Sequence, residues 1–259
     1  MEQGAFDKEF SCFQPELQSF LYRLTANRQL AEDLSQDSYL KARENLKKFR
    51  GESSLKTWVF SIASNLAKDE KRVQQRWGED WMDKVKDIHI SNPILMQQKI
   101  QTLQSSPEAA FVISEHINYC LSCTTKTLSL VQQLCLWLKD VYSFKVDEIC
   151  EIVDLSEGKV KHALAEARQN LNRIFKNKCA LVNQKGACHQ CSGLNKMYNP
   201  EEAEAKALNE VKLYRERKLH NHETLLKLRL DLARSLDPLN GKTEPLHRYL
   251  FEGTPGWAN

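Results

Sequence analysis

Five of the eight cysteines stand at spacings that suit a metal ion. Cys120 and Cys123 form one C-x-x-C pair, Cys188 and Cys191 form a second, and Cys179 lies shortly before the second pair. Two such pairs supply four thiolates, the ligand type and local spacing of a tetrahedral zinc site. The sequence therefore predicts a structural zinc ion at these cysteines, although the two pairs are unusually far apart along the chain.

Two other interpretations of the thiols stay open. All eight cysteines can be reduced thiols, or the paired ones can form disulfides under oxidation and act as a redox switch. Cys12, Cys135 and Cys150 stand apart from the pairs, and we expect them to be small core residues.

A second group of residues has the chemistry of nucleic-acid binding. Ser61, Asn65, Lys68 and Arg72 recur at helical spacing and form a polar, basic row. Residues 41–72 carry nine Lys or Arg and four Asp or Glu, a net charge of +5. Amide and cationic groups on one helix face can bind base edges and phosphates, although a charged face is more often simply solvated.

The loop before this row has the composition of a base pocket. It runs from Phe49 to Lys56, is short and polar, and contains Arg50 and the glycine Gly51. An extruded base costs a few kcal/mol, which aromatic stacking and hydrogen bonds in such a pocket can offset.

A third group lies on a predicted helix-turn-helix. Ile149, Ile152 and Val153 form the apolar face of a first helix, and Ser156 can cap a second helix. Residues 156–178 carry six cations and two acids, and a second helix with this charge is typical of a double-stranded DNA reader. Its candidate DNA contacts are Lys159, Lys161, His162, Arg168 and Arg173.

The elements that position these groups are predicted to be helices. With only nine glycines and seven prolines in 259 residues, the composition favours an all-α fold. Apolar stripes predict a helical pair over residues 5–29 interrupted by Pro15, a helix over 31–49 and another beginning at Ser53 or Ser54. The residues expected to be buried are Phe10, Phe13, Leu17, Phe20, Leu21 and Leu24, then Leu30, Leu34, Ala42 and Leu46, then Trp58, Ile62 and Leu66.

Two stretches resemble a known family. AEDLSQDSYLKA followed by FRGESSLKTWVFSIASNLAKDEKR resembles conserved region 2 of bacterial sigma factors of the extracytoplasmic-function class. The matching positions are Gly51, Trp58, Ile62, Ala63, Asn65, Asp69 and Arg72. The helix-turn-helix resembles sigma region 4, with departures: Ser143 replaces a usual glycine, Lys159 a threonine, and Glu166 a common arginine. His162-Ala163 stands in place of Ser-Arg, so promoter preference does not carry over.

The resemblance implies partners and roles. Core RNA polymerase would bind through its clamp coiled coil and its flap, with Asp33, Gln36 and Asp37 on the clamp-facing surface. Promoter DNA is the second partner, and an anti-sigma factor is a third that the resemblance allows. The minus-ten element would be contacted by Phe49, Arg50, Lys56, Ser61, Asn65, Lys68 and Arg72. The minus-thirty-five element would be contacted by the five candidate residues of the second helix.

The predicted organisation is two small helical domains joined by a linker, with a helical extension. A region 2 domain spans residues 1–76, a linker 77–107, a region 4 domain 108–178, a cysteine-containing segment 179–199 and the extension 200–259. The extension has a stripe of Leu225, Leu228, Leu232 and Leu236. It is predicted either to pack on the body or to serve regulation or oligomerisation.

The expected function is a sigma factor that binds core RNA polymerase and directs promoter recognition and opening. No paired carboxylates, nucleophile–base set or phosphate loop appears, so we do not expect an enzyme. The N-terminus lacks a signal sequence and no apolar run reaches the ~18 residues of a membrane span, which predicts a cytoplasmic protein. The alternative is a stand-alone helix-turn-helix regulator that responds to zinc or redox state.

Overall fold

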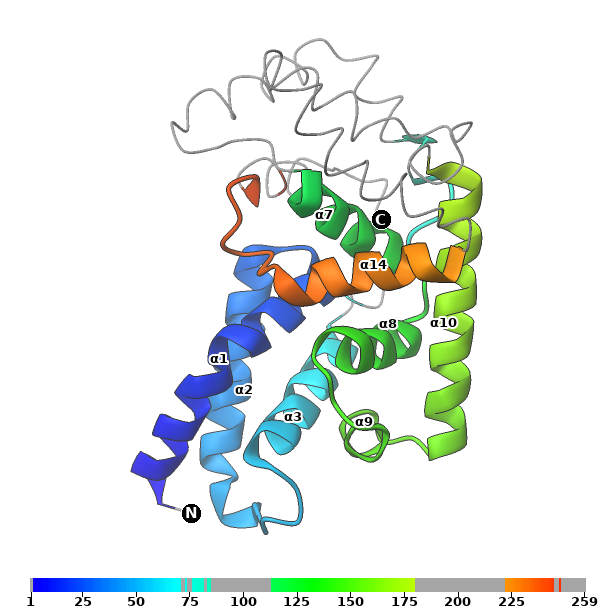
Figure 1. Cartoon of the computed structure of the whole chain (residues 1–259). Coiled ribbons are helices and arrows are strands. Elements are labelled where there is room, and N and C mark those ends of the chain that lie inside the picture. Colours follow the sequence, from blue (N-terminus) through cyan, green and yellow to red (C-terminus); the bar gives the residue numbers. More distant parts are fainter. Residues whose placement is uncertain are drawn as a thin grey trace. The chain divides into compact units, whose positions relative to one another are not determined.

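The described part of the chain is built from helices. The computed structural model describes residues 2–70, 73, 76–81, 83–84, 113–179, 222–244 and 247. Its elements are α1 (Gln3–Thr25), α2 (Arg28–Glu44), η1 (Leu46–Lys48), α3 (Leu55–Asp69), α7 (Ile113–Thr125), α8 (Leu130–Leu136), the π-helix η2 (Trp137–Val141), α9 (Val146–Val153), α10 (Glu157–Lys178) and α14 (His222–Ser235) (Figure 1). The predicted all-α class is confirmed for these residues.

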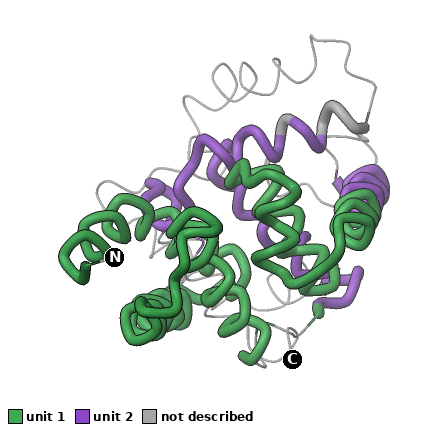
Figure 2. Tube along the Cα trace, turned by 90° about the horizontal axis from the view of Figure 1, so that it is seen from below, with its two compact units in different colours: residues 1–76, 128–167 green, residues 77–127, 168–259 purple. Residues whose placement is uncertain are grey.

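The helices fall into two compact units that do not follow the predicted domain boundaries. Unit 1 contains residues 1–76 and 128–167, and unit 2 contains residues 77–127 and 168–259 (Figure 2). The stretch that resembles region 4 is therefore divided, and most of it shares unit 1 with the stretch that resembles region 2. None of the described helices combines the length and the apolar character that a membrane crossing requires.

The first helix of unit 1 corrects one expectation. Residues 3–25 form a single helix and not a pair, with Pro15 inside it. Phe13 and Leu17 on either side of Pro15 are both buried, so packing holds the helix together where the proline removes a backbone hydrogen bond. All six apolar residues predicted to be buried in this stretch are buried.

The second and third helices begin at side-chain caps. The side chain of Asn27 accepts from the backbone N–H of Leu30 at 2.8 Å, and that of Ser54 accepts from Thr57 N–H at 3.0 Å. Both contacts satisfy backbone donors that a helix N-terminus otherwise leaves unpaired. Ser54, one of the two predicted caps, is therefore the cap of α3.

The buried face of α3 differs from the predicted one. The predicted stripe of Trp58, Ile62 and Leu66 is only half-buried. The buried row is shifted by one residue, to Leu55, Val59, Ala63 and Ala67. Both rows repeat every fourth residue, so periodicity alone does not choose between them. The two alanines allow the backbone of α3 to approach α1 and α2, against which it packs.

The helix-turn-helix forms as predicted. Ile149, Ile152 and Val153 of α9 are buried, and α10 begins directly after Ser156 with Val160 buried. Between the two helices, Asp154 adopts a left-handed conformation with φ of 57°. This sharp change of direction lets the apolar faces of α9 and α10 share one core while their polar faces stay exposed to solvent.

Ser143 occupies a backbone conformation that favours glycine. Its φ is 60°, in the left-handed region where a β-carbon costs roughly 1 kcal/mol. Replacing Ser143 with Gly should therefore raise the free energy of unfolding by about 0.5–1 kcal/mol. Gly51 has φ of +75° and open space where a β-carbon would lie. Gly51→Ala should therefore lower the free energy of unfolding by a similar amount, for conformational reasons alone. Urea unfolding measures the change in the free energy of unfolding for each variant. A loss of stability in Ser143→Gly would contradict the strained backbone conformation at Ser143.

Unit 2 includes part of the predicted linker. Trp77 and Trp81 are buried together with Cys123 and Ile174, and Trp77 N–H donates to the carbonyl of Lys126 at 2.9 Å. The two tryptophans have too much apolar surface to remain in a solvated linker, so Trp77 and Trp81 join the core of this unit.

The C-terminal helix α14 packs against α7 in the same unit. Its buried residues include Leu226, Leu230 and Ala233. Of the predicted leucine stripe, Leu232 and Leu236 are half-buried, while the side chains of Leu225 and Leu228 and all of residues 200–221 lie outside the described residues. The segment after α14 also contacts α7. The carboxylate of Glu115 on α7 accepts hydrogen bonds from the backbone N–H groups of Lys242 and Thr243, at 3.1 and 2.6 Å.

Candidate polymerase and promoter interfaces

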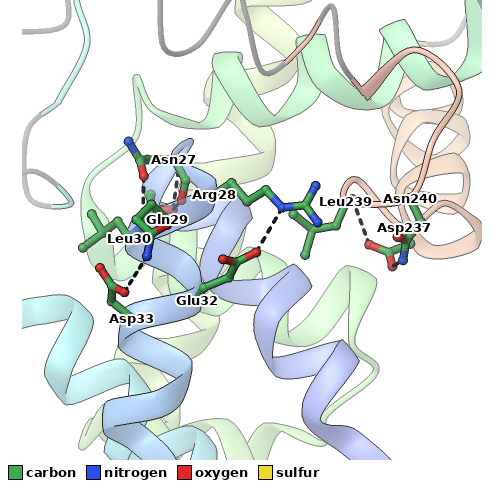
Figure 3. A network of polar contacts seen from close by, with 10 residues as sticks. Asn27, Arg28, Gln29, Leu30, Glu32, Asp33, Asp237, Leu239 and Asn240 are labelled. Carbon is green, nitrogen blue, oxygen red and sulfur yellow. Dashed lines mark hydrogen bonds and ion pairs between the residues drawn. The ribbon is translucent and has the colours of Figure 1, made fainter. Parts of the chain in front are cut away.

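The predicted polymerase-facing residues share one exposed face of α2. Asp33, Gln36 and Asp37 are all exposed, and Asp33 accepts a hydrogen bond from the side chain of Gln29 at 2.9 Å (Figure 3). Arg28 pairs with Glu32 on the neighbouring turn at 3.0 Å. The surface is acidic, begins at a capped helix N-terminus and is held by local contacts, so it is formed before any partner binds.

Sequence reasoning missed an apolar residue on this face. Leu40 is 43% exposed and follows Gln36 and Asp37 by four and three residues, which places it on the same side of α2. Such spacing could have indicated it from the sequence. An exposed leucine beside the carboxylates adds apolar area to this acidic face.

The loop before α3 is partly closed by its own aromatic residue. The ring of Phe49 packs on that of Trp58, with centroids 5.1 Å apart. Arg50 is largely exposed and lies 3.9 Å from Glu52. The side chain of Lys56 is engaged outside the loop. Its ammonium pairs with Glu16 at 2.6 Å and lies 4.9 Å from the ring centroid of Phe144. Of the three predicted pocket residues, only Arg50 is largely exposed to solvent.

The polar row on α3 is present, and it is partly engaged. Asn65 is exposed, while Lys68 donates to the side-chain oxygen of Asn65 at 3.1 Å and to the carbonyl of Val153 at 3.0 Å. The half-buried Ser61 donates to the carbonyl of Trp58. Arg72 lies outside the described residues. One end of the row therefore contacts α9 of the helix-turn-helix.

The first half of α10 presents its predicted DNA contacts to solvent. Lys159, Lys161 and His162 are exposed. Lys161 pairs with Glu157, which raises the pKa of the lysine, and His162 lies 3.3 Å from Glu166. These acids reduce the net positive charge of the face.

The second half of α10 behaves differently. Arg168 is half-buried, and Arg173 makes a two-pronged ion pair with Glu79, at 2.8 and 2.6 Å. The carboxylate raises the pKa of Arg173. Arg173 is exposed like Lys159, Lys161 and His162, but its guanidinium is paired with a carboxylate, as is the ammonium of Lys161.

The cysteines are only partly brought together. Cys120 and Cys123 lie one turn apart on α7, the first half-buried and the second buried, and burial raises the pKa of Cys123 well above its ordinary value. Cys179 is buried and accepts from Arg229 at 3.3 Å. Cys188 and Cys191 lie outside the described residues, within which no group of three or more metal-binding side chains occurs. Of the three predicted core cysteines, Cys135 is buried and Cys150 half-buried, but Cys12 is exposed and that expectation was wrong.

Comparison with known proteins assigns the two stretches. A model of sigma-70 region 2 matches residues 10–77, and a model of sigma-70 region 4 matches residues 119–171. The chain is 28% identical to the RNA polymerase sigma factor YlaC of Bacillus subtilis over 167 residues, which cover 61% of this chain and 84% of that protein. It is 25% identical to the ECF RNA polymerase sigma factor SigW of the same organism over 178 residues, which cover 68% of this chain and 91% of that protein.

A solved structure is also similar to this chain. It is the sigma factor RpoE of Bartonella quintana in complex with the anti-sigma factor NepR, with 20% identity over 66% of this chain and 97% of that one. The TM-score of 0.43 is too low to equate the two folds. The two region models and the curated relatives carry the assignment: the chain belongs to the extracytoplasmic-function class of the sigma-70 family, whose members work with core RNA polymerase and promoter DNA to direct promoter recognition in transcription initiation.

Proposed function

We propose that α3 and the loop before it bind the minus-ten element, and that α10 binds the minus-thirty-five element. The observation that carries this division is the set of exposed cations at the start of α10, together with the exposed amide of Asn65 on α3. A helix whose first turns carry exposed cations fits the major groove of duplex DNA. An amide next to an ammonium group suits a strand whose bases are unpaired.

The acidic face of α2 is proposed to bind the clamp coiled coil of core polymerase, and the helix-turn-helix part to contact the flap. The role is binding and positioning, so we propose that the chain has no enzymatic activity of its own and acts in the cytoplasm. An anti-sigma factor is a proposed partner on the family resemblance alone.

Binding to core polymerase in the absence of DNA separates this function from its alternative. The purified chain should capture core polymerase without DNA and should direct run-off transcription from a subset of a genomic promoter library. A stand-alone helix-turn-helix regulator would bind promoter fragments but would capture no polymerase, and that result would overturn the proposal.

His162 is proposed to contact a base edge, and Arg168 a phosphate. Replacing His162 with Ala should cost about 1–3 kcal/mol of binding and relax preference at a single base pair of the minus-thirty-five element. Arg168→Ala should weaken all promoter variants alike. Holoenzyme binding to a set of single-base promoter variants measures both effects. An equal loss across every promoter variant for His162→Ala would contradict its role in base recognition.

Zinc stays a prediction. If Cys120, Cys123, Cys188 and Cys191 share one ion, with Cys179 able to replace one of them, metal binding contributes directly to folding. Chelation should then lower the melting temperature of unit 2, leave α1–α3 folded, and weaken minus-thirty-five binding more than polymerase binding. Elemental analysis that finds no zinc, with every thiol freely titrated, would leave these residues as ordinary cysteines.

A further inference from the structure

A chain of polar contacts runs from the start of α8 to the exposed face of α10. The side-chain oxygen of Gln132 accepts from the backbone N–H of Ser129 at 3.1 Å, as part of the capping box that begins α8. The side-chain nitrogen of Gln132 donates to Oε2 of Glu166 at 3.1 Å, and Nε2 of His162 lies 3.3 Å from Oε1 of the same carboxylate. Gln132 and Glu166 are 34 positions apart in the sequence, so folding creates this connection.

The capping box determines which end of the Gln132 amide faces α10. Its oxygen is used by the N–H of Ser129, so its NH2 group is left for Glu166, and a carboxylate can only accept. The two oxygens of Glu166 therefore have different neighbours, one on α8 and one on α10. Contacts on both oxygens restrict a side chain that otherwise has many rotamers, so the carboxylate is positioned before DNA binds.

Glu166 shares the side of α10 that carries His162. Four residues separate the two, which places them one above the other on the helix, and their side chains are 45% and 74% exposed. An ionised carboxylate has about four acceptor sites, and the contacts with Gln132 and His162 use two of them. Glu166 therefore retains acceptor capacity on the face of α10 that is proposed to enter the major groove.

A carboxylate in the major groove distinguishes the bases by their hydrogen-bond donors. Cytosine presents the N4 amino group, whereas guanine and thymine present only acceptor atoms at this edge. Adenine has an amino group at N6, but its N7 acceptor would lie against the negative charge. A carboxylate is also repelled by the phosphates at every site, so a base donor is needed to offset that cost. Cytosine is the base that suits Glu166.

We propose that Glu166 is a specificity-determining residue that accepts a hydrogen bond from the N4 amino group of a cytosine in the minus-thirty-five element, and that Gln132 is the residue that positions it. The same carboxylate favours a proton on Nε2 of His162, which leaves Nδ1 as the ring atom for the neighbouring base. The inference rests on the proposed binding of this element by α10. It adds the base that the helix selects, and a residue of α8 on which the selection depends.

Substitution of Glu166 by arginine tests the base preference. Holoenzyme binding is measured for promoters that carry each base pair at each minus-thirty-five position. Wild type should prefer C·G over G·C at one position by about tenfold, and Glu166→Arg should reverse that preference, because arginine binds O6 and N7 of guanine. Glu157→Arg is the matched control. It makes the same change in charge at an exposed position of α10, nine residues away and thus half a turn around the helix.

The control should tighten binding to every promoter alike, because added positive charge acts on the phosphates. A wild-type preference for C·G that persists in Glu166→Arg would overturn the role of Glu166, as would a wild type that prefers another base pair at every position. If the wild-type holoenzyme discriminates at no position of the element, the proposed function of α10 fails, and the inference fails with it.

A second substitution tests the positioning role of Gln132 without removing the cap of α8. Gln132→Glu keeps an oxygen for the N–H of Ser129, because glutamate serves in a capping box as glutamine does. It removes the donor to Glu166 and places two carboxylates together. The preference for C·G over G·C should fall about three- to tenfold. Because this ratio compares two promoters bound by the same holoenzyme, a general loss of stability does not change it, and an unchanged ratio would overturn the positioning role.

Discussion

Charge reversal at Asp33 and Asp37 is expected to weaken binding to core polymerase by about a hundredfold. Both carboxylates are exposed on α2, and replacing them with lysine changes the local charge by four units opposite a partner surface that must be complementary to acid. Like charges placed against each other across an interface cost several kcal/mol, and a hundredfold corresponds to roughly 3 kcal/mol. The loss should shrink as salt concentration rises, because exposed charges are screened.

The double variant Glu2→Lys, Glu9→Lys is the control for charge alone. It makes the same change in net charge at exposed positions at the start of α1, on a different helix from Asp33 and Asp37. Fluorescence titration of core polymerase with each labelled sigma factor measures the affinity. Equal losses in the two variants would mean that overall charge matters and that α2 is not the docking face.

Removal of the Asn65 and Lys68 side chains is expected to impair promoter opening while sparing polymerase binding. Each is proposed to contact the minus-ten strand, and a polar contact to nucleic acid contributes about 1–3 kcal/mol, so the double alanine variant should open promoters on the order of a hundredfold less well. The two side chains hydrogen-bond each other, so their effects should not be additive. Lys68 also donates to the carbonyl of Val153, so its removal also takes away a contact between α3 and α9.

Permanganate reactivity of unpaired thymines measures the open fraction directly. Lys8→Ala removes one exposed cation from α1 of the same region and should open promoters like wild type. Full permanganate reactivity in the Asn65→Ala, Lys68→Ala variant would remove α3 from the minus-ten interface. A parallel titration with core polymerase keeps a loss of docking from being mistaken for a loss of melting.

Local sequence signals determined much of this molecule. The stripe from Leu30 to Leu46, the cap at Ser54 and the turn between α9 and α10 all depend on residues within a few positions of one another. Periodicity and capping act at that range, so the helices and the helix-turn-helix could be predicted. The family resemblance depends on the same local patterns. Ser143 stands at a usual glycine position of region 4, and the backbone there does adopt a positive φ.

Tertiary structure decided which face of each helix is buried and which charged groups are paired. Val59 and Ala63 are buried where Trp58 and Ile62 were expected, because α1 and α2 determine which side of α3 is covered. Lys56 pairs with Glu16, Arg173 with Glu79, and Arg23 with Tyr142, across 40, 94 and 119 positions of sequence. A helical repeat shows which residues share a face, but it contains no information about the distant segment that covers that face. The contact of region 2 with the helix-turn-helix in unit 1 could therefore be found only in the folded chain.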